Sequence, residues 1–322
     1  MNEYIIRKIT KKQGGKIYHK YYDKKMNEIC HIPTLKKITE GIYIPPAYNN
    51  VKINLHKHKK VRAIGYDVKG RPQYIYHKEF TQEQSDKKFD HMIQFGKKYH
   101  KINKTINEDL NSSNITNKQI AIILRLIMDC QFRIGNEKYF KDNQSYGTTT
   151  LEKKHMKIKN KSIDIDFIGK KNVRNKCTVK NKKVVHILKK RNKSLKDKNQ
   201  QIFTISSKQV NDYLKQFGNF SAKNFRTWGA NIEFILHILK LCKEKNEYSI
   251  SELKNILHQS IHKVAKKLHN TKNVCKSNYL DPELIKFFTN DYKKFLQLFY
   301  NNKKQINREK ISRLYVSFLE NI

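Results

Sequence analysis

The alternation of apolar and polar residues changes character roughly a quarter of the way along the chain. Before residue 80, segments such as IYHKYYD (17–23) and KGRPQYIYHKEF (69–80) alternate with a period of two, carry aromatic residues and are bounded by Gly or Pro. This pattern is typical of half-buried strands, and Gly14-Gly15-Lys16 predicts a hairpin turn between two of them. We therefore expect a small β-rich domain over residues 1–80.

Beyond residue 89 the apolar positions recur at helical spacing. Phe89 begins a pattern that continues at i+3, i+4, i+7 and i+11 with Met92, Ile93, Gly96 and His100. The segment NKQIAIILRLIMDCQF (117–132) predicts a more fully buried helix. Between the strand-like and the helix-like part of the chain, the segment TQEQSDKK (81–88) lacks large apolar residues, and we interpret it as a flexible linker.

A β insertion is expected within the helical part. Apolar residues at 163, 165 and 167 alternate with Asp164 and Asp166, residues 169–172 make a turn, and 173–179 return. Further helices are expected near 207–217, 221–243, 250–268 (with a capping box of Ser249 and Glu252) and 281–299. The fold class is α+β: a β-rich domain (1–80), a linker (81–88) and a larger, mainly α domain (89–322), two lobes that could clamp a duplex.

The charge of the chain points to a polyanionic partner. Its 322 residues include 68 Lys and Arg against 28 Asp and Glu, a formal net charge of +40. Such charge has no use in an enzyme for small neutral substrates, and 11% aromatic residues are too many for a disordered basic tail. Because Lys, Asn, Ile and Tyr share A/T-rich codons, part of the excess reflects genome composition, and the ten arginines are the more informative. Nucleic acid is the expected partner.

Several classes of cofactor and location are not expected. The five cysteines have no CxxC spacing, so we expect neither a disulfide framework nor a zinc site, and the N-terminus has no apolar signal region. No apolar run approaches the ~18 residues that span a membrane, so a soluble, reducing compartment is expected. P-loop and G-x-G-x-x-G motifs are missing, which argues against a nucleotide. The Asp164/Asp166 and His56/His58 pairs are interpreted as solvated surface, with no metal site.

Cleavage of DNA without a metal ion makes definite demands on side chains. A nucleophile must attack phosphorus, fixed cations must stabilise the transition state, and a general acid must protonate the leaving 5′ oxygen. Tyr can attack, although its reference pKa near 10 leaves only about 0.1% phenolate at neutral pH, so nearby positive charge must help. Two Arg, one Lys, one His and one Tyr would suffice.

Four stretches offer these residue types. They are CQFRIGNEKYF with Arg133, FIGKKNV with Lys170, SAKNFRTWGANIEF with Arg226, and KKLHNTKNVCKSNYLDPEL with His269 and Tyr279. Each also has a purely structural interpretation: a helix C-terminal cation for Arg133, a surface side chain for Lys170, stacking on Trp228 for Arg226, and one of 18 tyrosines for Tyr279.

Taken together and in order, these segments resemble the poxvirus-type DNA topoisomerase IB family. The resemblance covers residues from about 60 to 290 and includes IGYDVKGRPQYIYHK, RIGNEKYFKDN with GTTTLEKKH, DFIGKKNV, KNFRTWGAN and LHN…SNYLDP. Lys223 in the K-x-F-R-T string stands where tyrosine recombinases carry His. The A/T-rich codon usage would suit a giant DNA virus.

The resemblance implies a role for each residue. Tyr279 would form a 3′-phosphotyrosyl bond, Arg133, Arg226 and His269 would contact the non-bridging oxygens, and Lys170 would be the general acid together with Arg133. DNA contacts are implied for Arg71, Gln73, Tyr74, Tyr76, Lys138 and Tyr139.

The resemblance also implies an activity. It is an isomerase that relaxes supercoiled double-stranded DNA by cleavage, strand swivelling and religation, with no ATP, metal or other cofactor. A pyrimidine-rich site ending CCTT, a monomer, and a location in the virion or at the viral replication site in the infected host cell are implied as well.

Some positions depart from the family pattern. Asn136 replaces a basic residue, Lys171 replaces an acidic one, and the spacing from His269 to Tyr279 is one residue longer. Two alternatives stay open: a tyrosine recombinase or resolvase, against which Lys223 and the β-rich N-terminal domain argue, and a non-catalytic, lysine-rich architectural protein, which explains the charge but not the five ordered matches.

Overall fold

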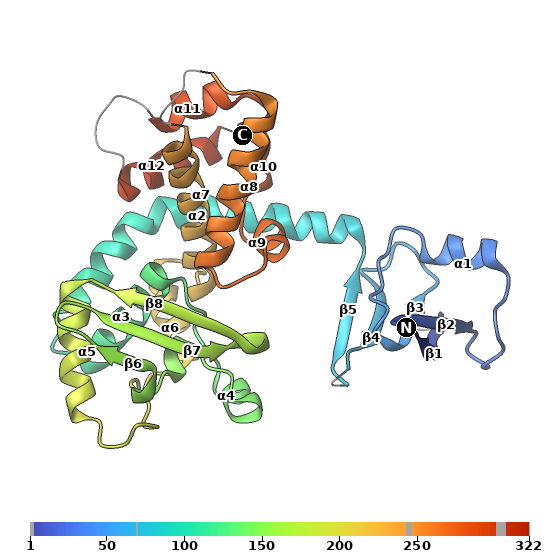
Figure 1. Ribbon diagram of the computed structural model, residues 1–322, viewed down its shortest axis with the longest axis horizontal. Helices are drawn as coiled ribbons and strands as arrows, with labels where there is room; N and C mark the ends of the chain where they lie inside the picture. Colours follow the sequence, from blue (N-terminus) through green and yellow to red (C-terminus); the bar gives the residue numbers. More distant parts are fainter. Residues whose placement is uncertain (1–2, 69, 243–246, 301–306, 322) are drawn as a thin grey trace. The chain divides into compact units, whose positions relative to one another are not determined.

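The computed structural model describes residues 3–68, 70–242, 247–300 and 307–321 (Figure 1). Contacts divide the chain into two units, Met1–Asp90 and His91–Ile322. The expected α+β class is confirmed, with strands dominating the first unit and helices the second.

The first unit is built on an antiparallel five-stranded sheet in the order β2-β1-β3-β4-β5. The strands are β1 (Tyr4–Gln13), β2 (Lys16–Tyr22), β3 (Asn49–Asn54), β4 (Val61–Tyr66) and β5 (Pro72–Tyr76). The predicted hairpin turn between β1 and β2 is confirmed, and Gly14 and Gly15 adopt the positive φ of +56° and +75° that glycine tolerates best. A short helix that the pattern did not predict, α1 (Ile32–Thr39), packs Leu35 and Ile38 against the buried face of the sheet.

Residues 81–88, interpreted above as a flexible linker, lie in helix α2 (Lys78–Asp109) rather than in an irregular segment. Gln, Glu and Lys are good helix formers, and the segment lacks apolar periodicity because its side chains, where described, are mostly exposed. The boundary between the two units falls after Asp90. The predicted domain limits stay a prediction.

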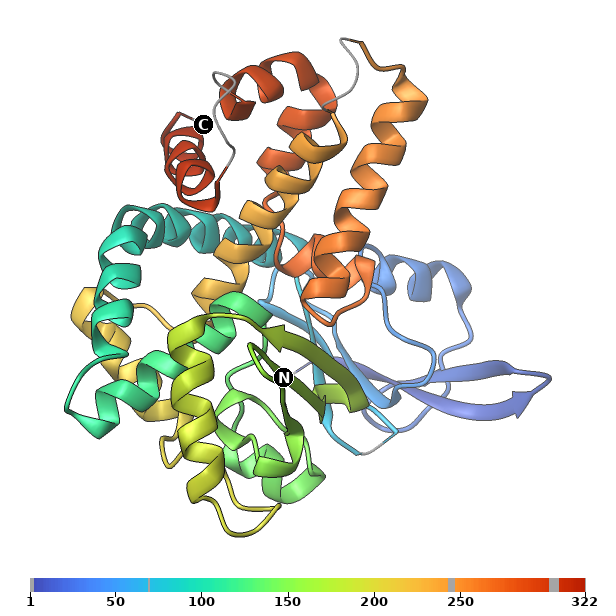
Figure 2. The ribbon, with the colours of Figure 1, turned by 60° about the vertical axis from the view of Figure 1, so that its left-hand side comes forward.

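The second unit combines helices with a three-stranded antiparallel sheet in the order β6-β7-β8 (Figure 2). The strands are β6 (Met156–Ile158), β7 (Ile163–Gly169) and β8 (Val173–Val179), and β7 and β8 confirm the predicted insertion. The helices after α2 are α3 (Ile115–Cys130), α4 (Glu137–Asn143), α5 (Lys182–Ser194), α6 (Ser207–Leu214), α7 (Ala222–Leu241), α8 (Ile250–Lys267), α9 (Lys272–Asn278), α10 (Pro282–Asn290), α11 (Tyr292–Tyr300) and α12 (Arg308–Glu320). Single 3₁₀ turns cover Thr148–Thr150, Lys153–His155, Lys170–Asn172 and Lys215–Phe217.

The core of this unit surrounds helix α7. Trp228 is buried, and the rings of Phe95, Tyr99 and Tyr315 lie 5.0–6.0 Å from it. Gly96 allows α2 to approach, since a Cβ there would stand 2.5 Å from a Trp228 ring carbon. The predicted capping box of α8 is confirmed.

Two further expectations need correction. The single helix expected over 281–299 is two helices, because the chain leaves helical geometry at Asp291 (φ −147°, ψ 76°). The expectation of no disulfide is wrong for one pair, since Cys130 and Cys177 are joined across 47 positions of sequence. Their Cα atoms lie 5.6 Å apart because α3 packs against β8, a proximity that no local spacing announces. Among the described residues, no helix is long and apolar enough to cross a membrane.

Candidate active site

All five predicted catalytic residues line one cavity of about 990 Å³ in the second unit. Arg133 follows α3, Lys170 stands at the turn between β7 and β8, Arg226 lies in α7, and His269 and Tyr279 follow α8 and α9. Further cationic side chains line the same cavity: Lys171, Arg174, Lys176, Lys223 and Lys266. Such a lining suits a polyanion.

Tyr279 and Arg226 form the buried centre of the cavity. Tyr279 is 8% exposed and Arg226 is 3% exposed. Arg226 Nη2 donates to the Leu268 carbonyl oxygen at 3.1 Å and lies 3.5 Å from the Tyr279 hydroxyl, while its guanidinium carbon lies 5.3 Å from the Tyr279 ring centre. The Arg226 guanidinium therefore lies against the ring of Tyr279. The Trp228 indole N–H donates to Ser312 instead.

The His269 ring is held in place through its Nε2 nitrogen. Its Nε2 lies 3.2 Å from the backbone nitrogen and 3.1 Å from the carbonyl oxygen of Lys176, in β8. Its backbone has φ +54°, and its Nδ1 is buried without a partner among the described residues. Burial, together with the charges of Arg226 and Arg133, holds the pKa of His269 below its ordinary value, which favours the neutral ring at neutral pH.

Asn270 is a residue of the site that the sequence reasoning missed. Its side-chain oxygen accepts a 2.7 Å hydrogen bond from Arg133 Nη2, and its Nδ2 is buried with no partner in the part of the chain described. The signal was the extra residue between His269 and Tyr279. The spacing in sequence from His269 to Tyr279 is one residue longer than the resemblance implies. Asn270, one position later, therefore stands at the spacing from Tyr279 that the family pattern gives to its histidine.

Asn231 fixes the backbone directly after Tyr279, on either side of Leu280, and was also missed. This buried α7 side chain donates to the Tyr279 carbonyl oxygen at 3.0 Å and accepts from the Asp281 backbone N–H at 2.9 Å. The Asp281 side chain accepts from the first turn of α10 and from the Tyr315 hydroxyl. Tyr279 is therefore held between α7 and a capped helix.

The electrostatics of the cavity lower the pKa of Tyr279. Burial alone would raise the pKa of Tyr279, but the charges of Arg226, Arg133 and Lys223 outweigh it and place the pKa below its usual value. Burial lowers the pKa of Arg226 as well. Positive charge is thus concentrated around Tyr279, where the negative charge of a bound phosphate would compensate it.

Lys170 is exposed at the hairpin turn, with its ammonium 5.9 Å from the ring centre of Tyr139. Tyr139 and Lys138 are exposed on α4, so two of the predicted DNA contacts lie on the helix beside Lys170. Asn136, a departure from the family pattern, caps α4 by accepting from the Tyr139 backbone N–H.

The other predicted DNA contacts lie in the first unit, on β5 and the turn before it. Tyr74 and Tyr76 are exposed, and their rings stack with centres 6.4 Å apart. Asp67 accepts hydrogen bonds from the side chains of Arg71 and Gln73. Tyr74 and Tyr76 thus form an exposed aromatic patch on the edge strand β5, while Arg71 and the partly exposed Gln73 are bonded to Asp67.

Carboxylates near the cavity are engaged with cations. Asp164 pairs with Lys159, and Asp166 pairs with Arg174 and Lys176. Among the described residues, no cluster of three or more His, Cys, Asp or Glu could hold a metal ion.

Known proteins similar to this chain carry consistent names. A family model described as eukaryotic DNA topoisomerase I, catalytic core, matches residues 77–308. DNA topoisomerase 1B of Acanthamoeba polyphaga mimivirus is 28% identical over 300 residues, covering 89% of this chain and 88% of that protein. DNA topoisomerase 1 of Rabbit fibroma virus (strain Kasza) is 25% identical over 316 residues, covering 96% and 97%. DNA topoisomerase 1B of Vaccinia virus (strain Copenhagen) is 30% identical over 231 residues, covering 69% and 70%.

Proposed function

This chain belongs to the DNA topoisomerase IB family, and we propose that the cavity around Tyr279 is where it cuts and rejoins a DNA strand. The activity, that of a type IB topoisomerase, follows from the family. The assignment of residues to steps is our proposal.

One observation carries this proposal: buried polar groups around Tyr279 lack partners. Arg226 Nε and Nη1, His269 Nδ1 and Asn270 Nδ2 all lack a hydrogen-bond partner within the described residues. A buried donor left unpaired costs about 1–3 kcal/mol, so such groups are rare unless a ligand completes them. A phosphodiester would supply acceptor oxygens to all of them at once.

The chemistry then follows from the positions of the side chains. The Tyr279 hydroxyl gives up its proton to solvent, and its oxygen forms a bond to phosphorus while the bond from phosphorus to the 5′ oxygen breaks. Arg226 and Arg133 stabilise the charge on the non-bridging oxygens, and Lys170, together with Arg133, supplies the proton that the 5′ oxygen takes up. Religation is the reverse, and the phosphotyrosyl bond retains the energy of the broken phosphodiester.

The residue that accompanies the two arginines is either His269 or Asn270, and we propose that both face the phosphate. His269 keeps Nδ1 available while Nε2 is fixed on β8, and Asn270 holds Arg133 and keeps Nδ2 available. His269→Ala and Asn270→Ala are each expected to slow cleavage, and only Asn270→Ala should also weaken the contribution of Arg133. A double variant with Arg133→Ala measures that coupling.

Several finer expectations remain proposals from the family resemblance. They are a pyrimidine-rich cleavage site ending CCTT, action as a monomer without nucleotide, DNA contacts by Arg71, Gln73, Tyr74, Tyr76, Lys138 and Tyr139, and a place in the virion or at the viral replication site. The exposed patch on β5 and the position of Tyr139 beside Lys170 support the DNA contacts.

The deciding experiment is plasmid relaxation in EDTA without ATP, with SDS added to trap covalent adducts. We expect relaxation and an adduct for the natural protein, and neither for Tyr279→Phe. Tyr300→Phe, a change at a tyrosine 38% exposed on α11, is the matched control and should behave as the natural protein does. An adduct that persists in Tyr279→Phe would refute the assignment of the nucleophile.

A further inference from the structure

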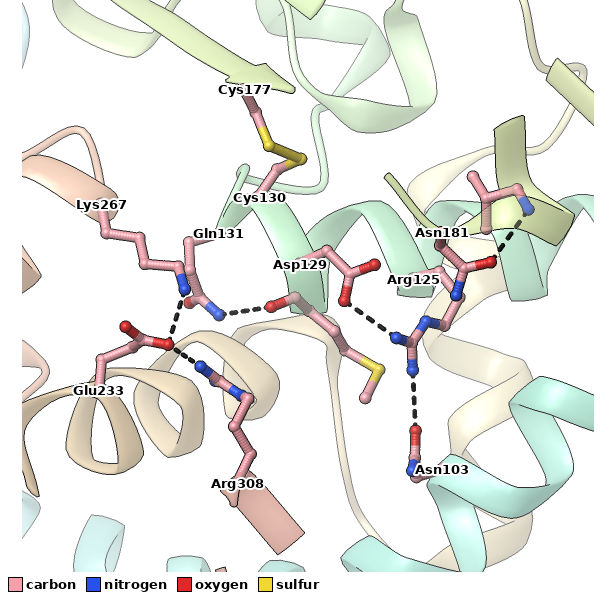
Figure 3. A network of polar contacts seen from close by, with 12 residues as sticks. Asn103, Arg125, Asp129, Cys130, Gln131, Cys177, Asn181, Glu233, Lys267 and Arg308 are labelled. Carbon is pink, nitrogen blue, oxygen red and sulfur yellow. Dashed lines mark hydrogen bonds and ion pairs between the residues drawn. A yellow bond between two sulfur atoms is a disulfide. The ribbon is translucent and has the colours of Figure 1, made fainter. Parts of the chain in front are cut away.

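The disulfide between Cys130 and Cys177 joins two segments that carry catalytic side chains. Cys130 is the last residue of α3, three positions before Arg133. Cys177 lies in β8, directly after Lys176, whose backbone holds His269 Nε2. Figure 3 shows the bond at the end of α3, above the ion pair of Arg125 with Asp129 in the same helix.

Apart from the disulfide, the segment after Cys130 is attached to the hairpin by ring packing and through residues 146–149, whose backbone N–H groups donate to Arg133, Ile134 and Ile168. Phe132 is buried and packs with its ring centre 4.9 Å from Phe167 of β7 and 5.6 Å from His269. On its far side, the end of α3 is tied by Arg125 to Asp129 and Asn103 (Figure 3). The disulfide is the covalent tie from this fixed end to the hairpin whose turn carries Lys170.

The bond is also accessible to small thiols. Cys177 is partly exposed and lines a cavity of about 460 Å³ with Lys154, Lys157 and Lys176. Asp164 and Asp166 line the same cavity, so the three lysines leave it only a small excess of positive charge. Two other thiols are poor competitors, since burial raises the pKa of Cys242 to about 11 and of Cys275 to about 12.

We propose that the Cys130–Cys177 disulfide is a reversible positioning element for DNA cleavage, formed and broken by exchange with a small thiol and disulfide pair of the glutathione class. In forming, the two protein thiols give two electrons and two protons to one small disulfide, which leaves as two thiols. The crosslink holds the Lys170 hairpin against the Arg133 end of α3, so the general acid meets the 5′ oxygen in the oxidised protein. This inference rests on the proposed roles of Lys170 and Arg133.

The test compares the full-length protein after incubation with oxidised or reduced glutathione. Thiol alkylation and mass spectrometry confirm the state of each cysteine, and single-turnover adduct formation is measured on a duplex containing a mapped cleavage site. A misplacement of about 1 Å can cost ~100-fold in rate, so we expect reduction to slow cleavage by about tenfold or more at unchanged DNA affinity. Cys177→Ser and Cys130→Ala should be slow in both states, and Cys30→Ser, at an exposed free thiol, should respond like the natural protein.

A second substrate separates positioning from general stabilisation. A duplex with sulfur in place of the 5′ bridging oxygen has a leaving group that needs no acid, so its cleavage should be equally fast in both states. Equal rates on the ordinary duplex would overturn the proposal, and so would an equal loss on both substrates. Lys170→Ala serves as the reference: if sulfur does not rescue it, the role of Lys170 fails, and the ordinary duplex alone decides whether the crosslink controls the rate.

Discussion

Replacing Arg226 by Lys tests whether the guanidinium acts through its charge or through its several donors. Arg226 is buried on α7, with Nη2 committed to the Leu268 carbonyl oxygen and the Tyr279 hydroxyl. Its Nε and Nη1 lack partners among the described residues and are the groups left for a phosphate. A lysine ammonium retains the charge but is a single donor centre on a flexible stem.

The expected size of the effect follows from how many hydrogen-bond donors the substitution removes. Removing one preorganised donor to a developing oxyanion costs about 10²–10³ in rate. Because Lys can replace at most one of the two available nitrogens, we expect Arg226→Lys to slow cleavage by ~10² or more. Arg226 is the largest of the influences that lower the pKa of Tyr279. Loss of its hydrogen bond to the Tyr279 hydroxyl in Arg226→Lys should therefore also slow cleavage.

The assay is single-turnover formation of the SDS-stable adduct at saturating protein, with DNA affinity measured separately. Arg125→Lys is the matched control, because Arg125 lies on α3 and pairs with Asp129 and Asn103 away from Tyr279. We expect the control to cleave within twofold of the natural protein. An Arg226→Lys protein that cleaves within threefold of it would refute the argument from the two unpaired nitrogens.

Three further outcomes are expected. Lys170→Ala should slow cleavage of an ordinary duplex yet cleave a 5′-phosphorothiolate duplex at nearly the natural rate; no rescue would mean that Lys170 has another role. Gly96→Ala should lower the urea-derived free energy of unfolding by about 1–3 kcal/mol, since its Cβ would stand 2.5 Å and 2.8 Å from Trp228 ring carbons; an unchanged midpoint would contradict this. Burial lowers the pKa of His155 to about 4, so the unfolded chain takes up a proton first, and stability should fall by about 2–3 kcal/mol from pH 6.5 to 4. His155→Asn should flatten that profile.

The sequence predicts elements wherever a local pattern dictates them. The period-two alternation before Gly169 and the residues after it are enough to place Lys170 at a hairpin turn, which the structure confirms. The pair of helices over 281–299 is predicted as one because the apolar spacing continues through Asp291, where the backbone turns. Residues 81–88 resemble a linker in sequence because an exposed helix needs no apolar stripe.

What the sequence could not predict depends on interactions between distant segments. Asn231 acts on Tyr279 across 48 positions, and Asn270 holds Arg133 across 137. The disulfide likewise joins residues that meet only when β8 packs on α3. Asn231 and the two cysteines follow no local spacing rule, and for Asn270 the one signal was the longer spacing to Tyr279. The five predicted catalytic residues could be named because each stands in a recognisable string, and the structure brings all five to one cavity.

The unpaired Nε and Nη1 of Arg226 also predict that this side chain lowers the stability of the DNA-free fold. Within the described part of the chain, Arg226 forms no ion pair with a carboxylate, although it is 3% exposed. A buried charge without a counter-ion destabilises the fold, and an apolar side chain of similar length removes that penalty. We therefore expect Arg226→Met to abolish adduct formation while raising the melting temperature of the DNA-free protein. When a cleavable duplex binds, the melting temperature of the natural protein should rise to at least that of Arg226→Met, because a ligand of the folded state stabilises it. A lower melting temperature for Arg226→Met without DNA would show that the hydrogen bond to Leu268 outweighs the cost of burying the charge.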